Sequence, residues 1–239
     1  MESHEHPDSL EVDPGVSYAV LPGAGSAGEA WEELVNELDA RLLPVGDLPS
    51  VLSMAEALLP AIDSMSRPRV IVGASLGAMV AIELARRTPV DALVLAAAGF
   101  GITVGDRLLD WVSSNPPDLL EKMAHAGLAD PGDPRLVEIR HRDFLARGQP
   151  TLLNHLRALA VYRPQPLREP PPTLVLWGEH DRSVPLDDHA KLAVAMRGVL
   201  VPIAGAGHAP FLERAPEVAR WAHVALRLGA AKGCARRPS

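Results

Sequence analysis

The chain has 239 residues, of which 47% are hydrophobic and 22% are charged, and its formal net charge is -7. This length suits one α/β domain with a single large core, the composition excludes a disordered chain, and the acidic balance argues against a nucleic-acid-binding surface. No segment has the roughly 18 unbroken apolar residues of a membrane span, and the single cysteine, Cys234, cannot form an internal disulfide.

The first part of the chain alternates predicted strands with predicted helices. Residues 1–15 lack the cationic and apolar regions of a signal peptide, so we expect a flexible tail on a cytoplasmic protein. Apolar runs predict strands and apolar residues at helical spacing predict helices. The predicted order is strand 16–21, helix 29–38, strand 41–45, helix 51–65, strand 70–72, helix 76–87 and strand 92–97. The alternation indicates a mostly parallel sheet with helices on both faces.

The pattern changes after Gly99. Residues 103–163 show about four helical stretches and no strand, which predicts a helical cap over about 101–165. A proline-rich linker then leads to the last predicted elements, which are strand 173–177, helix 187–196, strand 199–203 and a helix near 216–228. We therefore expect one domain over 16–228, followed by a flexible tail over 229–239.

The motif Gly73-x-Ser75-x-Gly77 lies where a predicted strand meets a predicted helix. Glycines two residues before and after the serine allow a sharp turn, which holds the serine in a strained conformation with its hydroxyl beyond the sheet. The following helix directs its N-terminal amides to the same place, where they favour developing negative charge. Ser75 is therefore a candidate nucleophile.

A serine nucleophile needs a base that takes its proton and an acid that orients the base. Asp181 lies just past predicted strand 173–177, and His208 lies in a glycine-rich loop just past predicted strand 199–203. The order Ser75, Asp181, His208 is that of the α/β-hydrolase arrangement. Acyl transfer also needs donors for an oxyanion, worth about 3 to 4 kcal/mol each, and the backbone amides of Ala24 and Leu76 are the candidates.

Four segments, LPGAGSAGEAW, GASLGA, WGEHDRSVP and GAGHAPFLERAPEV, resemble the landmark loops of α/β-hydrolase-fold serine hydrolases. The resemblance covers nearly all of residues 16–228 and is strongest to small capped carboxylesterases, including those that cleave the methyl ester of pimeloyl carrier protein. It implies that Ser75 is the nucleophile, His208 the general base and then acid, and Asp181 its orienting partner. It also implies Ala24 and Leu76 as oxyanion donors, and no cofactor.

The sequence departs from these relatives at three places. Pro22-Gly23 stands where they have His-Gly, so a histidine that braces the oxyanion loop is missing. Ala74 replaces the histidine or tryptophan common before the nucleophile, which implies a wider pocket floor. The loop after the second predicted strand, GDLPS, is shorter than the glycine-rich stretch of the relatives. These departures bear on the substrate more than on the fold.

The predicted cap contains the candidate substrate pocket. Trp111, Met123, Phe144 and Leu152 are the candidate pocket residues, although side chains at such positions also suit ordinary helix packing. The cap region is also rich in arginine, which either forms solvated helix faces with local ion pairs or docks an acidic carrier protein or a phosphopantetheine-linked substrate. These arginines are Arg135, Arg140, Arg142, Arg147, Arg157, Arg163 and Arg168.

The sequence thus predicts a serine hydrolase that cleaves a small-molecule ester through an acyl-enzyme intermediate. The histidines do not form a metal-site pattern, because His4 and His6 lie in the expected tail and the pair Glu138 and His141 has no second pair. Two alternatives stay open. The same residues would serve a thioesterase, lactonase, carbon-carbon bond hydrolase or perhydrolase, or the chain is a ligand-binding relative without turnover. Neither the acyl and alcohol parts of the substrate nor the oligomeric state follows from the sequence.

Overall fold

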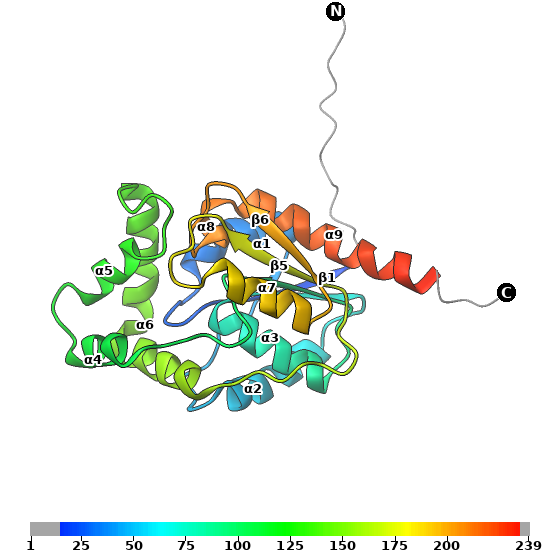
Figure 1. The fold of residues 1–239 in the computed structure, drawn as a ribbon, viewed down its shortest axis with the longest axis horizontal. Coiled ribbons are helices and arrows are strands. Elements are labelled where there is room, and N and C mark those ends of the chain that lie inside the picture. Colours follow the sequence, from blue (N-terminus) through cyan, green and yellow to red (C-terminus); the bar gives the residue numbers. More distant parts are fainter. Residues whose placement is uncertain (1–14, 235–239) are drawn as a thin grey trace, which may run out of the picture.

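The computed structural model describes residues 15–234, which contain one sheet of six parallel strands in the order β2-β1-β3-β4-β5-β6 (Figure 1). Val20 pairs with Val72, and Val72 in turn pairs with Val94. Because every pair is parallel, the carboxyl ends of all the strands lie at one edge of the sheet. The strands are β1 (Ser17–Leu21), β2 (Arg41–Leu42), β3 (Arg69–Ala74), β4 (Ala92–Ala96), β5 (Thr173–Gly178) and β6 (Val199–Ile203). The predicted parallel α/β architecture is confirmed.

Helices cover both faces of the sheet (Figure 1). One face packs against α2 (Val51–Asp63), α3 (Leu76–Arg87) and α7 (Leu186–Ala195), and the other packs against α1 (Glu32–Leu38) and α9 (Ala215–Cys234). Side chains of a strand point alternately to the two faces, so Ile71 joins the first core while Val70 and Val72 join the second. Burial on both faces explains the continuous apolar runs of the strands.

The sheet and its termini differ from the prediction at two places. The strand expected over 41–45 pairs only at Arg41–Leu42, since Pro44 has no N–H for the ladder and the chain leaves the sheet after Leu43. The last helix continues to Cys234, so the tail expected over 229–239 is helical as far as that residue. The rest of that tail and residues 1–14 of the N-terminal tail lie outside the described residues. Among residues 15–234, no helix has both the length and the apolar character to cross a membrane.

The segment between β4 and β5 forms a helical cap beside the sheet (Figure 1). Its helices are α4 (Asp106–Ser114), α5 (Leu119–His125) and α6 (Pro134–Val161). Gly148 has a φ of 77°, which most residues rarely adopt, and it bends α6 into two helical halves. Val112, Leu119, Phe144 and Leu152 pack together as a cluster of the cap's own.

Candidate active site

The turn after β3 holds Ser75 in a strained backbone conformation, with φ 52° and ψ -116°. The two glycines that flank Ser75 are required because there is no room for a side chain at either position. A Cβ on Gly73 would lie 2.5 Å from the carbonyl oxygen of Gly77, and a Cβ on Gly77 would lie 2.0 Å from that of Leu21. Only glycine at both positions lets strand and helix approach so closely, and Ser75 consequently lies directly at the start of α3.

Asp181 and His208 meet at the carboxyl edge of the sheet. Asp181 follows β5, His208 follows β6, and Nδ1 of His208 lies 2.9 Å from Oδ2 of Asp181. Oδ1 of Asp181 accepts the amides of Ser183 and Val184 at 2.8 and 3.0 Å. Burial alone would raise the pKa of Asp181, but the hydrogen bond and charge of His208 together with the two amides lower it. The ionised carboxylate therefore fixes the proton of neutral His208 on Nδ1 and leaves Nε2 as the basic nitrogen.

A second histidine, His189 of α7, lies behind Asp181, and the sequence analysis did not select it. Its Nε2 is 4.0 Å from Oδ2 of Asp181, and its side chain is fully buried. Nε2 accepts the amide of Ala98 at 3.2 Å, while Nδ1 donates to the carbonyl oxygen of Pro185 at 3.1 Å. Burial lowers the pKa of His189, so this imidazole is neutral and the contact is not an ion pair. The charge of Asp181 is thus directed at His208.

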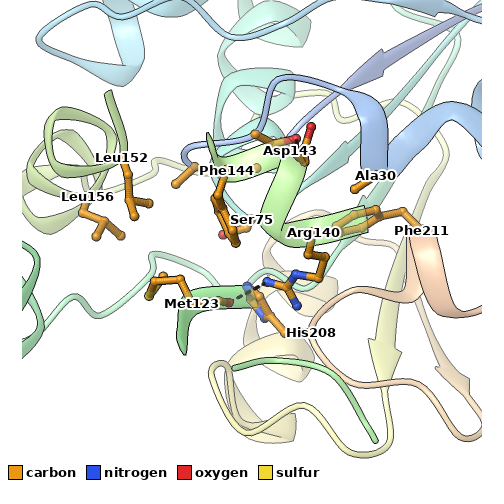
Figure 2. Close-up of a pocket in the computed structure, with 13 residues that line it drawn as sticks. Ala30, Ser75, Met123, Arg140, Asp143, Phe144, Leu152, Leu156, His208 and Phe211 are labelled. Atoms are coloured by element: carbon orange, nitrogen blue, oxygen red, sulfur yellow. Dashed lines mark hydrogen bonds between the residues drawn. The ribbon is translucent and has the colours of Figure 1, made fainter. Parts of the chain in front are cut away.

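Ser75 and His208 line the same pocket between the sheet edge and the cap (Figure 2). The pocket is partly open to solvent and has a volume of about 120 Å³, close to that of a cavity that holds a benzene-sized molecule. Three of the predicted pocket residues, Met123, Phe144 and Leu152, line it. Trp111 does not, because it packs against the cap cluster instead. The other lining residues are Gly23, Ala24, Ser26, Ala30, Arg140, Asp143, Leu156 and Phe211.

The two predicted oxyanion donors flank Ser75 on different segments. Leu76 is the first residue of α3, so its amide has no acceptor within the helix. Ala24 lines the pocket in the loop after β1, and its amide has no acceptor among residues 15–234. Both amides are therefore free to bind an oxygen of a ligand.

A buried carboxylate of the cap holds the loop after β1. Oδ1 of Asp143 accepts the amides of Ala27, Gly28 and Glu29 at 3.1, 2.7 and 2.8 Å. Oδ2 accepts the hydroxyl of Ser26 at 2.5 Å. Glu29 is the first residue of the short helix η1 (Glu29–Trp31) and Gly28 is its N-cap, so the amide of Glu29 has no acceptor within the helix itself. The cap thus supplies the N-terminal capping group for this loop.

His155, in the second half of α6, holds the same loop one residue earlier. Its Nδ1 accepts the amide of Gly25 at 3.1 Å, and its Nε2 donates to the carbonyl oxygen of Gly46 at 3.1 Å. Burial lowers the pKa of His155, and the neutral imidazole offers the one acceptor and one donor that these partners need. A histidine of the cap therefore braces the loop that follows Pro22.

Glu213, on the short helix α8 (Pro210–Glu213), ties the loop of His208 to the cap. Its two carboxylate oxygens accept the amides of Gly207 and Ala129 at 2.8 and 2.6 Å. The backbone amide of His208 also donates to the carbonyl oxygen of Gly127 in the cap at 2.5 Å. The position of the imidazole consequently depends on the cap as well as on the sheet.

Sequence reasoning missed Asp143, His155 and Glu213. The only signal for Asp143 is its spacing on α6, where Arg140, Asp143 and Phe144 share a face with the apolar Leu136. Charged side chains on an apolar helix face indicate buried, partnered charges rather than a solvated face.

The cap arginines do not form one patch. Arg140 is buried, Arg142 pairs with Glu29 and Glu138 at 2.5 and 3.2 Å, and Arg147 donates to a backbone carbonyl. Of the seven arginines in residues 135–168, four are exposed and have no carboxylate within 4 Å among residues 15–234. These are Arg135, Arg157, Arg163 and Arg168.

His4 and His6 lie outside the described residues. Among residues 15–234, no group of three or more histidine, cysteine, aspartate or glutamate side chains is arranged to hold a metal ion.

Comparison with known proteins gives relatives along nearly the whole chain. Residues 19–221 match the model of the alpha/beta hydrolase family. The chain is 30% identical to a pimeloyl-(acyl-carrier protein) methyl ester esterase of Stenotrophomonas maltophilia, over 86% of this chain and 90% of that protein. A thermophilic esterase of known structure superposes with a TM-score of 0.77 at 24% identity, covering 89% of this chain and 90% of that one. The enol-lactonase of Burkholderia xenovorans superposes with a TM-score of 0.76 at 17% identity, covering 89% and 92%.

Proposed function

The chain belongs to the alpha/beta hydrolase family, and from that membership we propose that it is a serine hydrolase that cleaves a carboxylic ester through an acyl-enzyme intermediate. The 30% identical esterase relative supports the carboxylesterase class. The observation that carries the proposal is the Asp181–His208 hydrogen bond of 2.9 Å beside a pocket that Ser75 also lines.

In the proposed first half of the reaction, Oγ of Ser75 attacks the carbonyl carbon of the ester while Nε2 of His208 takes the hydroxyl proton. The carbonyl oxygen becomes an oxyanion, which the amides of Ala24 and Leu76 bind. Asp181 stabilises the imidazolium through Nδ1. The carbon–oxygen bond to the alcohol then breaks, and His208 returns its proton to the departing alkoxide.

In the proposed second half, water attacks the acyl carbon of the Ser75 ester while His208 again takes a proton. Collapse of the second tetrahedral intermediate releases the carboxylic acid and returns the proton to Oγ of Ser75. Both halves use only protein groups and water, so the proposal requires no cofactor.

The first test is labelling with a fluorophosphonate probe together with hydrolysis of p-nitrophenyl esters of increasing acyl length. We expect the wild-type protein to be labelled and to turn over the short esters repeatedly, because the pocket has a volume of about 120 Å³. Ser75→Ala should be neither labelled nor active while it unfolds at a similar urea concentration. A folded wild-type protein that neither labels nor turns over would favour the ligand-binding alternative instead.

A carrier-protein-linked methyl ester is the second candidate substrate. The name of the Stenotrophomonas relative states this substrate for that protein. The exposed, unpaired arginines of the cap, among them Arg135 and Arg157, support contact with an acidic carrier protein. If this candidate is correct, kcat/KM for a carrier-bound methyl ester should exceed that for the free ester and fall as salt is raised, with Arg135→Gln and Arg157→Gln showing weaker salt dependence.

A further inference from the structure

Arg140 of α6 is a buried cation in the pocket, with only 9% of its surface exposed. Among residues 15–234, it has no carboxylate within the 4 Å of an ion pair, and Nη1 has no hydrogen-bond partner. Its one hydrogen bond is a long one, 3.5 Å from Nη2 to the carbonyl oxygen of Met123. The guanidinium lies over the ring of Phe144, 5.5 Å from its centre. A buried charge with so little compensation is costly, and burial accordingly lowers the pKa of Arg140 to about 10.

The acidic side chains whose charges act on Arg140 form neither an ion pair nor a hydrogen bond with it. Asp143 and Glu213 act on Arg140 at longer range. The oxygens of Asp143 are taken by Ser26 and three amides of its loop, and those of Glu213 by two further amides. These carboxylates therefore moderate the potential around Arg140, but the hydrogen-bonding capacity of Nη1 stays unused.

The unpaired nitrogen lies next to the proposed base. A Cβ on Gly127 would lie 3.3 Å from Nη1 of Arg140 and 3.1 Å from Cβ of His208, so both side chains flank the same glycine. Figure 2 shows the guanidinium beside His208, in the pocket that Ser75 lines. Arg140, His208 and Ser75 thus line one pocket, so a single ligand bound there could contact all three.

We propose that Arg140 binds a carboxylate of the substrate, so that the enzyme selects compact esters that carry a free carboxylate. This inference rests on the proposed function, because it names the substrate class of that same site. A guanidinium suits a planar, singly charged carboxylate, and Nη1 of Arg140 has a hydrogen-bonding capacity that no group among residues 15–234 uses. The small pocket places the carboxylate within a few bonds of the scissile ester, in either its acyl or its alcohol part. Hydrolysis would then release a dicarboxylic acid or a hydroxy acid.

The test compares charged esters with neutral esters of the same shape. Methyl hydrogen succinate against methyl succinamate probes the acyl side, and O-acetylglycolate against O-acetylglycolamide probes the alcohol side. We expect wild-type kcat/KM to favour the charged member of at least one pair by about 10- to 100-fold, the range of a buried charged hydrogen bond. Arg140→Gln should remove that preference with little loss on the neutral ester, and Arg140→Lys should retain part of it. Arg220→Gln, which removes an exposed charge on α9 outside the cap and the pocket, should leave the preference unchanged.

Two outcomes would overturn the proposal while leaving the proposed function intact. One is active wild-type enzyme with no preference for either charged ester. The other is an equal loss on charged and neutral esters in Arg140→Gln, which would mean that Arg140 only neutralises Asp143 and Glu213.

A binding measurement separates this inference from the hydrolase proposal. Succinate should bind to Ser75→Ala in calorimetry, and binding should weaken at least tenfold when Arg140→Gln or, if that variant does not fold, Arg140→Lys is added. Absence of both labelling and turnover in wild-type protein would refute the hydrolase proposal alone, whereas absence of succinate binding together with indifference to substrate charge would refute the role of Arg140.

Discussion

Asp143 of the cap and Ser26 of the loop after β1 are joined by a hydrogen bond of 2.5 Å, although 117 positions separate them in the chain. The same carboxylate accepts three further amides of that loop, which also carries the proposed oxyanion donor Ala24. The cap and the proposed oxyanion hole are therefore one hydrogen-bonded unit.

Replacing Asp143 tests this unit directly. Asp143→Ala should lower the free energy of unfolding by about 3 kcal/mol, because buried amides that lose their acceptor cost about 1 to 3 kcal/mol each. Asp143→Asn keeps an acceptor at Oδ1, so it should lower the free energy of unfolding by only about 1 kcal/mol. Urea unfolding measures both, and kcat of the alanine variant should fall at least about tenfold. Equal stability and activity of the two variants would contradict the role of this side chain in holding the loop.

Asp181 should give a stability difference that depends on pH. Its pKa is lowered in the folded protein from an ordinary value of 3.8, so its charged form contributes stability above that value and the contribution is lost as pH falls through the lowered pKa. Asp181→Asn should therefore have a lower free energy of unfolding than wild type at neutral pH. The difference between the two free energies should become smaller in acid. Urea unfolding of both proteins from neutral pH down to about pH 3 measures this difference. A difference of constant size would contradict this reasoning.

The same variant should lose most of its activity. An asparagine leaves His208 without the charge that stabilises the imidazolium and permits the wrong tautomer, so kcat should fall by about 10³- to 10⁴-fold. The p-nitrophenyl ester assay measures this effect. His189→Gln offers a comparison, because neutral His189 lies 4.0 Å from the same carboxylate and is not proposed to transfer a proton in the reaction. Its kcat should fall much less than that of Asp181→Asn.

Gly77 should not tolerate a methyl group. Gly77→Ala would place Cβ 2.0 Å from the carbonyl oxygen of Leu21, so strand β1 and helix α3 would have to separate. We expect a loss of at least about 3 kcal/mol, at the upper end for overpacking, or no folded protein. Gly105→Ala is the matched control, since nothing lies within 4 Å of its Cβ and its φ is -78°. Urea unfolding of that control should stay within about 0.5 kcal/mol of wild type.

Met123 and Trp111 should behave differently although both were predicted to line the pocket. Met123→Ala enlarges the pocket and should move the preferred p-nitrophenyl ester to a longer acyl chain. Trp111→Ala removes packing within the cap and should lower stability without changing that preference. An acyl-length shift in Trp111→Ala, or none in Met123→Ala, would show that the pocket is shaped otherwise.

Much of the fold could be predicted from the sequence, because the patterns that indicate helices and strands involve residues close together in the chain. The helix predicted over 76–87 has those bounds in the structure, and the strand over 199–203 likewise. Apolar runs and helical spacing depend on neighbours in the chain, so a single sequence contains them. The second strand was too long in the prediction because the proline at 44 ends its pairing, a signal that was present but outweighed by the apolar residues around it.

The arrangement of the site followed only in part. Ser75, Asp181 and His208 were selected because each follows a predicted strand, and parallel strands bring such residues to one edge of the sheet. The roles of Asp143 and Arg140 depend on contacts between the cap and the sheet domain, which no local pattern encodes. Arg140 was placed among the cap arginines that either form solvated faces or dock an acidic partner, and Asp143 was not selected, since spacing shows which residues share a face but not what covers it.

Because α6 bends at Gly148, both of its halves form hydrogen bonds with the loop after β1. The half before the bend holds the loop through Asp143, and the half after it holds the loop through His155. If the cap moved away from the sheet, the hydrogen bonds of Asp143 and His155 with this loop would break, and the loop amides would lose their acceptors. In the proposed mechanism, such a displacement would expose Ser75 to water and at the same time release the loop of the proposed oxyanion donor Ala24, so the cap is both a wall of the pocket and a support of that loop.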